Sequence, residues 1–344
     1  MHATRRLFIT AVSAALASCG ARDKIAKGLP SLDIDRLTSE FPRLSERARP
    51  GVFGLGVELV RAPHSWVSDA STRFPMQSVF KAPLAAAALA EVDAGRLKLS
   101  EPITLTDLDL SPPYSEIDEQ WPTPPDHHSL TLPAIDLIAL AVQRSDNTAA
   151  DVIMKRIGGP GAVTAWLRGK SIQDISIDRY ERELQQDVAG MEPFRPAWKD
   201  EAAWVAARAT VPAQQREAAM AAYMADPRDT TTVPAALDFL HQLYLGALLS
   251  PASTRLLIRL MTASSTGAAR LRAGLPPGSV LAQKTGSART DLGLTPATNE
   301  IALVTLPNGR RLAIAAFLAG STATAPDRDK LIADGARLIV SCVK

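Results

Sequence analysis

Ser78 and Lys81 are the first residues of the sequence whose types and spacing could do nucleophilic chemistry. Residues three apart share one face of a helix, so the Lys81 amine can reach the Ser78 hydroxyl. A serine hydroxyl is a weak nucleophile until a neighbouring group takes its proton. The spacing alone is a weak indication, because average composition gives about one Ser-x-x-Lys in a chain of this length. Ser341 and Lys344 have the same spacing, and there we expect only a fraying helix end.

Two tripeptides further along the chain strengthen the first pair. Residues 145–147 read Ser-Asp-Asn and lie between two predicted helices, a junction where polar side chains can project into a cleft. Residues 284–286 read Lys-Thr-Gly at the end of an apolar stretch, which places them on a strand, and Gly286 lets a ligand approach the backbone closely. Each tripeptide has about a one-in-ten chance of arising by accident. In this order, the three motifs are the signature of the penicillin-recognising serine enzymes.

A fourth motif resembles a feature that separates class A β-lactamases from their relatives. Residues 179–185, Arg-Tyr-Glu-Arg-Glu-Leu-Gln, resemble the start of that family's Ω loop, and residues 226–232 resemble its end. The resemblance covers residues 33–344 and includes the runs FPMQSVFK at 74–81, SDNTAAD at 145–151, KTGSA at 284–288 and ATNEIALVTLPNGR at 297–310. The first and last runs are similar to the extended-spectrum, cephalosporin-hydrolysing branch. The resemblance implies a β-lactamase/transpeptidase-like fold and a serine β-lactamase activity that confers resistance.

By this resemblance, Ser78 is the nucleophile that attacks the β-lactam carbonyl. Its proton goes to Lys81, or to Glu181 through a water, and which of the two acts is disputed for the family. The backbone N–H groups of Ser78 and Ser287 form the oxyanion hole, which stabilises charge that develops in the transition state. Ser145 passes a proton to the departing ring nitrogen, and Glu181 then activates the water that hydrolyses the acyl-enzyme. No metal or organic cofactor is implied.

The resemblance also implies how a β-lactam is held. Asn147 binds the side-chain amide of the substrate, and Lys284 and Thr285 bind its carboxylate. Asp146, in the middle of the Ser-Asp-Asn motif, is expected to brace the helix junction rather than to do chemistry. Arg289, which follows the Lys-Thr-Gly strand, either helps to bind a carboxylate or faces solvent.

The Ω-loop region departs from the family in two respects. Gln185 stands where asparagine usually helps to hold the hydrolytic water, and its extra methylene could displace that water. The family closes the neck of the loop with an Arg–Asp ion pair, here Arg179 and Asp229, within roughly a dozen residues of the glutamate. In this chain 48 positions separate Glu181 from Asp229. Residues 186–228 therefore contain an insert, expected to be a small helical subdomain at the cleft edge that acts as a lid, as a specificity wall or as decoration only.

The stretch before the Ser-Asp-Asn motif, residues 111–130, is long and rich in proline. Leu110 falls near the position where many relatives place an aromatic gatekeeper. His127 and His128 could suggest a metal site, but no third ligand has suitable spacing, so we expect this pair to be solvated.

The elements that must position these motifs change in type along the chain. Residues 51–60 alternate apolar and small or polar side chains, as a strand does, and Asn308-Gly309 between two β-rich segments favours a hairpin. Helical periodicity marks residues 33–48, 78–95, 131–143, 147–157, 234–249, 251–264 and 327–343. Strands at both ends with helices between them predict an α+β fold, in which an antiparallel sheet flanked by the terminal helices carries an inserted all-helical domain.

We therefore predict four parts: a signal peptide at 1–18, a tether at 19–32, a discontinuous α/β domain at 33–74 and 265–344, and a helical domain at 75–264 with an enlarged Ω loop at about 179–229. The chain of 344 residues is 46% hydrophobic, too apolar for a disordered protein. Its net charge of +2 lacks the basic character of a nucleic-acid-binding domain. The expected partners are small-molecule β-lactams alone, and the expected state is a monomer.

Residues 1–18 resemble an export signal. Arg5 and Arg6 precede an uncharged run of 12 residues, shorter than the ~20 that span a bilayer and typical of a signal peptide. Cys19 falls where a lipoprotein is acylated after cleavage, although residues 15–17, Ala-Leu-Ala, also fit an ordinary cleavage site. The two arginines fit either a twin-arginine or a Sec signal. The prediction is a periplasmic protein anchored through Cys19 or released in soluble form, with Cys342 as an unpaired thiol.

Two alternatives share part of the signature. A cell-wall DD-peptidase or related hydrolase would have Ser78, Lys81, Ser145 and Lys284 but would lack a deacylating glutamate. A lipoprotein that is acylated by penicillin and stays acylated would fit the long insert and Gln185. A class C enzyme or esterase would show Tyr-x-Asn, which the sequence lacks.

Overall fold

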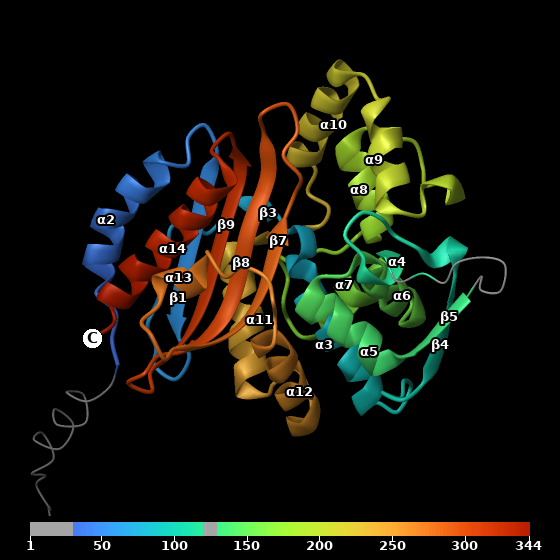
Figure 1. The fold of residues 1–344 in the computed structure, drawn as a ribbon. Coiled ribbons are helices and arrows are strands. Elements are labelled where there is room, and N and C mark those ends of the chain that lie inside the picture. Colours follow the sequence, from blue (N-terminus) through green and yellow to red (C-terminus); the bar gives the residue numbers. More distant parts are fainter. Residues whose placement is uncertain (1–29, 120, 122–128) are drawn as a thin grey trace, which may run out of the picture.

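The computed structural model describes residues 30–119, 121 and 129–344. A five-stranded antiparallel sheet, in the order β2-β1-β9-β8-β7, stands beside a group of helices, and its strands come from both ends of the chain (Figure 1). Its strands are β1 (Val52–Leu59), β2 (Ser65–Val67), β7 (Val280–Ser287), β8 (Thr295–Thr305) and β9 (Arg311–Ser321). The predicted α+β class with an antiparallel sheet is confirmed.

The central strands of the sheet are covered on both faces. Alternate residues of β9 belong to two separate hydrophobic clusters: Leu312, Ile314, Ala316 and Leu318 to one, and Ala313, Ala315 and Phe317 to the other. Successive side chains of a strand point to opposite faces, so each cluster is the packing of one face. The terminal helices α2 (Ile34–Glu46) and α14 (Ala325–Ser341) cover the first face, and α11 (Val233–Leu245) covers the second.

The predicted hairpin joins β8 to β9, with Thr305 paired to Arg311. The Gly309 amide donates to the Leu306 carbonyl at 2.8 Å, and Gly309 takes φ +81°. Asn308 does not have the positive φ that a two-residue turn would need, because this connection is longer; its side chain accepts from the Arg310 amide at 3.1 Å instead. The hairpin is confirmed, with a wider turn than Asn-Gly alone suggests.

The helical part is built around α3 (Lys81–Asp93), in which every residue from Lys81 to Leu89 is buried. A helix that is apolar on all sides must be surrounded by other elements, and the small alanine side chains of α3 allow close approach. It contacts the π-helical turn η3 (Leu140–Arg144), α6 (Asn147–Arg156), α7 (Pro160–Gly169) and α12 (Pro251–Thr262). The preceding helix α5 (Ala134–Ala139) packs into the same hydrophobic core. All the helices predicted from periodicity are confirmed, and α7 is an additional one.

The enlarged Ω loop is helical, as expected. It contains α8 (Glu181–Ala189), the short η4 (Pro196–Trp198), α9 (Glu201–Ala209) and α10 (Ala213–Ala225), which lie together beside one end of the sheet (Figure 1). The chain then returns through β6 (Thr230–Thr232), which pairs with β3 (Arg73–Pro75). The remaining elements are β4 (Pro102–Thr106), η2 (Asp107–Asp109), α4 (Glu116–Glu119), β5 (Ser129–Pro133) and α13 (Leu271–Gly274).

Some predictions fall on other parts of the chain. The signal peptide, Cys19, His127 and His128 lie outside the described residues, and the predicted domain boundaries stay a prediction. Among the residues that are described, no helix is both long and apolar enough to cross a membrane.

Candidate active site

Ser78 lies in a 3₁₀ turn, η1 (Gln77–Phe80), which follows β3 and leads directly into α3. Gln77 takes φ +47°, so the chain changes direction sharply just before Ser78. The Asn299 side chain, on β8, donates to the Met76 carbonyl at 3.1 Å and ties the turn to the sheet. The candidate nucleophile is therefore held between the sheet and the buried helix.

Gly286 of β7 lies against the same turn. A Cβ atom at this position would be 2.3 Å from the Met76 carbonyl oxygen and 3.0 Å from the Val79 nitrogen. Only glycine lets the strand pass this close, so the space that Gly286 leaves is taken by the turn that carries Ser78. The expectation that Gly286 also lets a ligand approach the backbone stays a prediction.

Ser78, Lys81 and Glu181 converge on one oxygen atom. The Ser78 Oγ donates to Glu181 Oε1 at 3.1 Å, and Lys81 Nζ lies 3.0 Å from the same Oε1. The Lys81 amine also donates to Asn147 Oδ1 at 2.5 Å and to the Ser145 carbonyl at 2.7 Å. Lys81 and Glu181 are both completely buried, and a buried charge needs such a set of partners. This geometry places a carboxylate and an amine where either can take the Ser78 proton.

Ser145 and Lys284 form the opposite side of the site. Ser145 ends η3 in a left-handed conformation, with φ +63°, and its Oγ accepts from Lys284 Nζ at 2.9 Å. Lys284 lies in β7 and is fully buried. Burial, together with the positive charge of Lys81, holds the pKa of Lys284 well below that of a free lysine. A lysine of this kind can exchange a proton with the Ser145 hydroxyl.

Asp146 caps α6 and braces the helix junction. Its carboxylate accepts from the Ala149 amide at 2.8 Å, from the Ile117 amide at 3.0 Å and from Ser115 Oγ at 3.0 Å. These are the contacts of a structural residue, as expected from the sequence. Asn147 is fixed from two sides, because besides its bond with Lys81 its Nδ2 donates to the carbonyl of Pro113 at 2.6 Å.

The predicted ion pair closes the neck of the Ω loop. Arg179 Nε lies 2.6 Å from Asp229 Oδ2, and both side chains are buried. The second oxygen of Asp229 accepts from the amides of Asp178 and Arg179 at 2.7 and 3.2 Å. Arg179 also pairs with Asp187 in α8 at 2.8 Å and Asp226 after α10 at 3.4 Å. One arginine thus joins both ends of the loop.

Gln185 reaches Glu181 within α8. Its Nε2 donates to Glu181 Oε2 at 3.1 Å and to the side-chain oxygen of Gln77 at 3.3 Å. Thus Oε1 of the glutamate faces Ser78 and Lys81, whereas Oε2 is held by an amide. Gln185 therefore lies beside the candidate base, and its part in holding a water stays a prediction.

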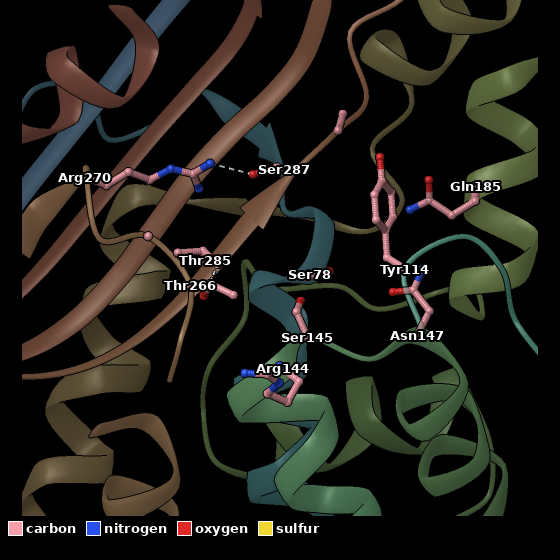
Figure 2. A pocket seen from close by; sticks show the side chains of 12 residues that line it. Ser78, Tyr114, Arg144, Ser145, Asn147, Gln185, Thr266, Arg270, Thr285 and Ser287 are labelled. Carbon is pink, nitrogen blue, oxygen red and sulfur yellow. Dashed lines mark hydrogen bonds between the residues drawn. The ribbon is translucent and has the colours of Figure 1, made fainter. Parts of the chain in front are cut away.

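A cavity of about 300 Å³ opens above Ser78. Figure 2 shows Arg270, Ser287, Thr285 and Thr266 on one side of Ser78 and Tyr114, Gln185 and Asn147 on the other. Ser145 lies next to Ser78 between these groups. Among the described residues, no group of three or more His, Cys, Asp or Glu side chains could hold a metal ion.

The comparisons with known proteins agree with this geometry. The family model described as "Beta-lactamase enzyme family" matches residues 36–343. The chain belongs to this family, and it is a class A β-lactamase. Beta-lactamase VEB-1 of Pseudomonas aeruginosa is 30% identical over 266 residues, which are 77% of this chain and 76% of that protein. The extended-spectrum β-lactamase PER-1, also of Pseudomonas aeruginosa, is 27% identical over 77% of this chain and 74% of its own.

Solved structures give the same result. A β-lactamase from Chitinophaga pinensis has a TM-score of 0.71 and 30% identity, over 87% of this chain and 96% of that one. The reconstructed last common ancestor of the class A β-lactamases of Gram-negative bacteria has a TM-score of 0.70 and 34% identity, over 89% and 98% of the two chains.

Arg270 is a cavity residue of this β-lactamase that the sequence did not reveal. It lies 14 positions before Lys284, and its Nη2 donates to Ser287 Oγ at 2.7 Å. An ion pair with Asp329 at 2.7 Å and a bond to the Asn299 carbonyl at 3.0 Å hold the guanidinium in place. No local pattern marks Arg270, because three separate elements of the fold bring it to the strand.

Arg289, the arginine that the sequence did consider, is held elsewhere. It pairs with Glu201 of α9 at 3.0 Å and lies over the rings of Tyr114 and Trp204 at 5.3 and 5.9 Å. Its contacts are with the insert and Tyr114, and it does not line the cavity. Trp204 is buried and packs inside the insert region.

Tyr114 and Asp151 are two further residues of the site that the sequence did not indicate. Leu110, at the expected gatekeeper position, is buried in the hydrophobic core, and Tyr114 lines the cavity instead, in a left-handed conformation with φ +69°. Asp151 accepts from the Glu181 and Arg182 amides at 2.7 and 3.0 Å, so it caps the helix that carries the glutamate. This cap comes from α6 and has no signature near residue 181.

Proposed function

We propose that this β-lactamase hydrolyses the β-lactam ring through an acyl-enzyme on Ser78, and so confers resistance to these antibiotics. The observation that carries the proposal is the convergence of Ser78 Oγ and Lys81 Nζ on Glu181 Oε1, at 3.1 and 3.0 Å, beneath the cavity. A serine in this setting has a base in direct contact and needs no metal to be activated.

In the acylation step, Ser78 Oγ attacks the ring carbonyl carbon while its proton passes to the Glu181–Lys81 pair. The backbone N–H groups of Ser78 and Ser287 stabilise the oxyanion. The bond between the carbonyl carbon and the ring nitrogen then breaks, and the nitrogen takes a proton from Ser145. Lys284, at 2.9 Å from Ser145 Oγ, is placed to resupply that proton.

The substrate carboxylate is proposed to bind at the cationic end of the cavity. Lys284 and Arg270 supply the positive charge there, and the Thr285 hydroxyl, 2.7 Å from that of Thr266, supplies a hydrogen-bond donor. At the other end, one N–H of the Asn147 amide is used by Pro113, which leaves its second N–H for the amide carbonyl of the substrate.

Deacylation is assigned to Glu181. Once Ser78 is acylated, its oxygen has no proton to donate, so Glu181 Oε1 becomes available to a water. The carboxylate removes a proton from this water as it attacks the ester carbonyl, and the Ser78 oxygen leaves with a proton from the same pair. Gln185 keeps Oε2 occupied and so fixes which oxygen acts.

Turnover of a chromogenic cephalosporin by the purified protein tests the proposal. We expect Ser78→Ala to abolish turnover. The matched control is Ser341→Ala, in the second Ser-x-x-Lys, because the Ser341 hydroxyl contacts two near neighbours, the Leu338 carbonyl and Cys342 Sγ, and lies at the end of α14. Folded wild type that becomes acylated without turning over would instead indicate a penicilloyl-binding protein or a DD-peptidase-like enzyme.

We also propose that the enzyme is exported and anchored in the membrane through a lipid on Cys19, as a monomer. Support comes from the basic, then apolar, sequence of residues 1–18 and from the position of Cys19. Cys342, the other cysteine, is buried and therefore a poor site for a lipid. Labelling cells with a radioactive fatty acid tests this proposal: Cys19→Ala should lose the label and Cys342→Ala should keep it. Label that persists in Cys19→Ala would contradict the anchor.

A further inference from the structure

The insert reaches the catalytic glutamate through a buried tyrosine. Tyr223 lies near the end of α10 and is 3% exposed. Its hydroxyl accepts from Gln77 Nε2 at 2.6 Å. Gln77, which precedes Ser78, accepts in turn from Gln185 Nε2 at 3.3 Å, and Gln185 donates to Glu181 Oε2 at 3.1 Å. Three consecutive hydrogen bonds therefore connect α10 with the base.

The direction of this chain is fixed by its last member. An ionised carboxylate only accepts hydrogen bonds, so Gln185 must turn its NH₂ group toward Glu181. Gln185 then has its second N–H for Gln77, which must present its oxygen there and its nitrogen to Tyr223. Burial raises the pKa of Tyr223, so its oxygen stays that of a neutral phenol, and the Arg179 guanidinium lies 5.8 Å from the centre of its ring.

The length of Gln185 explains why its side chain needs a second hydrogen-bond partner. Its family counterpart, asparagine, has one methylene fewer and one rotatable bond fewer. A longer amide must lose more rotamer freedom to hold one position, and a second hydrogen bond can hold it there. Gln77 provides that bond, and Tyr223 keeps the Gln77 amide from turning over.

We propose that Tyr223 is a positioning residue for deacylation, which acts through Gln77 and Gln185 on the carboxylate of Glu181. The proposal rests on the deacylating role assigned to Glu181 above. It gives the insert a catalytic purpose beyond that of a lid or wall. Tyr223 of α10 fixes the Gln77 amide, and this amide holds Gln185, the longer residue that stands at the family's asparagine position.

Tyr223→Phe is the sharpest test, because it keeps the ring, its packing and its contact with Arg179 but removes the hydroxyl. We expect the acyl-enzyme to accumulate and kcat to fall about tenfold, the effect of one lost buried hydrogen bond, with kcat/KM for acylation changed less than about twofold. Tyr244→Phe is the matched control, since Tyr244 is a partly buried tyrosine of α11 that contacts Arg61 and Arg311, and it should change neither quantity.

A double-mutant cycle with Gln185→Asn separates positioning from simple stability. The shorter amide no longer depends on Gln77, so adding Tyr223→Phe to Gln185→Asn should have less than about a twofold effect on kcat. Equal effects of Tyr223→Phe in both backgrounds, or a parallel loss of kcat and kcat/KM, would overturn the proposal. If Glu181→Ala itself deacylates normally, the assigned function fails first; if Glu181→Ala traps the adduct and Tyr223→Phe does not, this inference alone fails.

Discussion

The charged side chains beneath the cavity and those of the insert differ in how far they are buried. Beneath the cavity, Lys81, Glu181 and Lys284 are almost or completely removed from water and depend on one another. In the insert, charged groups such as Arg208 and Arg216 keep 17% and 16% of their side-chain surface exposed and pair across a boundary between elements. Breaking a fully buried pair leaves a charge without compensation and costs several kcal/mol, whereas a pair that keeps some contact with water contributes less. The buried charges of the site therefore depend more strongly on their partners than the partly exposed charges of the insert.

The largest effect is expected at the cavity floor, from Lys81→Met. The substitution keeps the length of the side chain but removes the amine that holds Glu181, Asn147 and Ser145 together. We expect kcat/KM to fall about 10³-fold, the range of a lost general acid–base group. Stopped-flow acylation measures this, with Lys155→Met as the control because Lys155 is 70% exposed and, among the described residues, pairs with Asp109 alone. An equal loss of kcat/KM in both variants would show that the buried lysine matters no more than the exposed one.

Arg179→Ala should destabilise the fold by about 3–5 kcal/mol, since it leaves Asp229 buried and unpaired at the neck of the loop. Denaturant unfolding of the purified wild type and variant measures this difference in the free energy of unfolding. Arg337→Ala, at an exposed arginine paired with Asp334, should cost no more than about 0.5 kcal/mol. A small loss in Arg179→Ala would mean that the neck is not closed by its ion pair.

Glu300 in β8, which pairs with Thr285 of β7, should make the free energy of unfolding depend on pH. It is fully buried, it accepts from the Leu271 amide at 2.9 Å, and burial raises its pKa to about 8. The folded protein therefore keeps a proton that the unfolded chain releases near pH 4.5, and this contribution to stability is lost as pH rises toward 8. Glu300→Gln should remove that part of the decline, on the order of 3 kcal/mol between pH 5 and 8. If the free energies of unfolding of wild type and Glu300→Gln change in parallel with pH, this expectation is wrong.

The smallest effect is expected in the insert. Asp291→Ala removes the common partner of Arg208 and Arg216 and should cost about 1 kcal/mol, with kcat unchanged. Faster proteolysis within α9 and α10 would report the loosened contact. A large drop in kcat would show that the surface contacts of the insert, and not only Tyr223, support catalysis.

Sequence reasoning succeeded where chemistry depends on short spacings. Ser78 and Lys81 lie one helical turn apart, Ser145 and Asn147 lie at a single junction, and the hairpin around Gly309 is local. Contacts between elements that are distant in the chain were predicted where the family resemblance supplied them, as for Arg179 and Asp229, and were missed elsewhere. Arg270, Tyr114 and Asp151 reach the site through the packing of the whole fold, and nothing near them in the sequence indicates that. The glycine at 286 was recognised, but the neighbour that requires it, the Met76 carbonyl beside Ser78, lies 210 positions away from Gly286 along the chain.

The central claim is that Ser78 is acylated and that Glu181 releases it. Intact-protein mass spectrometry after mixing with a cephalosporin tests this directly. Wild type should return to its unmodified mass once substrate is consumed, and Glu181→Ala should retain an adduct on Ser78 that is absent from Ser78→Ala. Clearance of the adduct by Glu181→Ala at the rate of wild type would contradict the account.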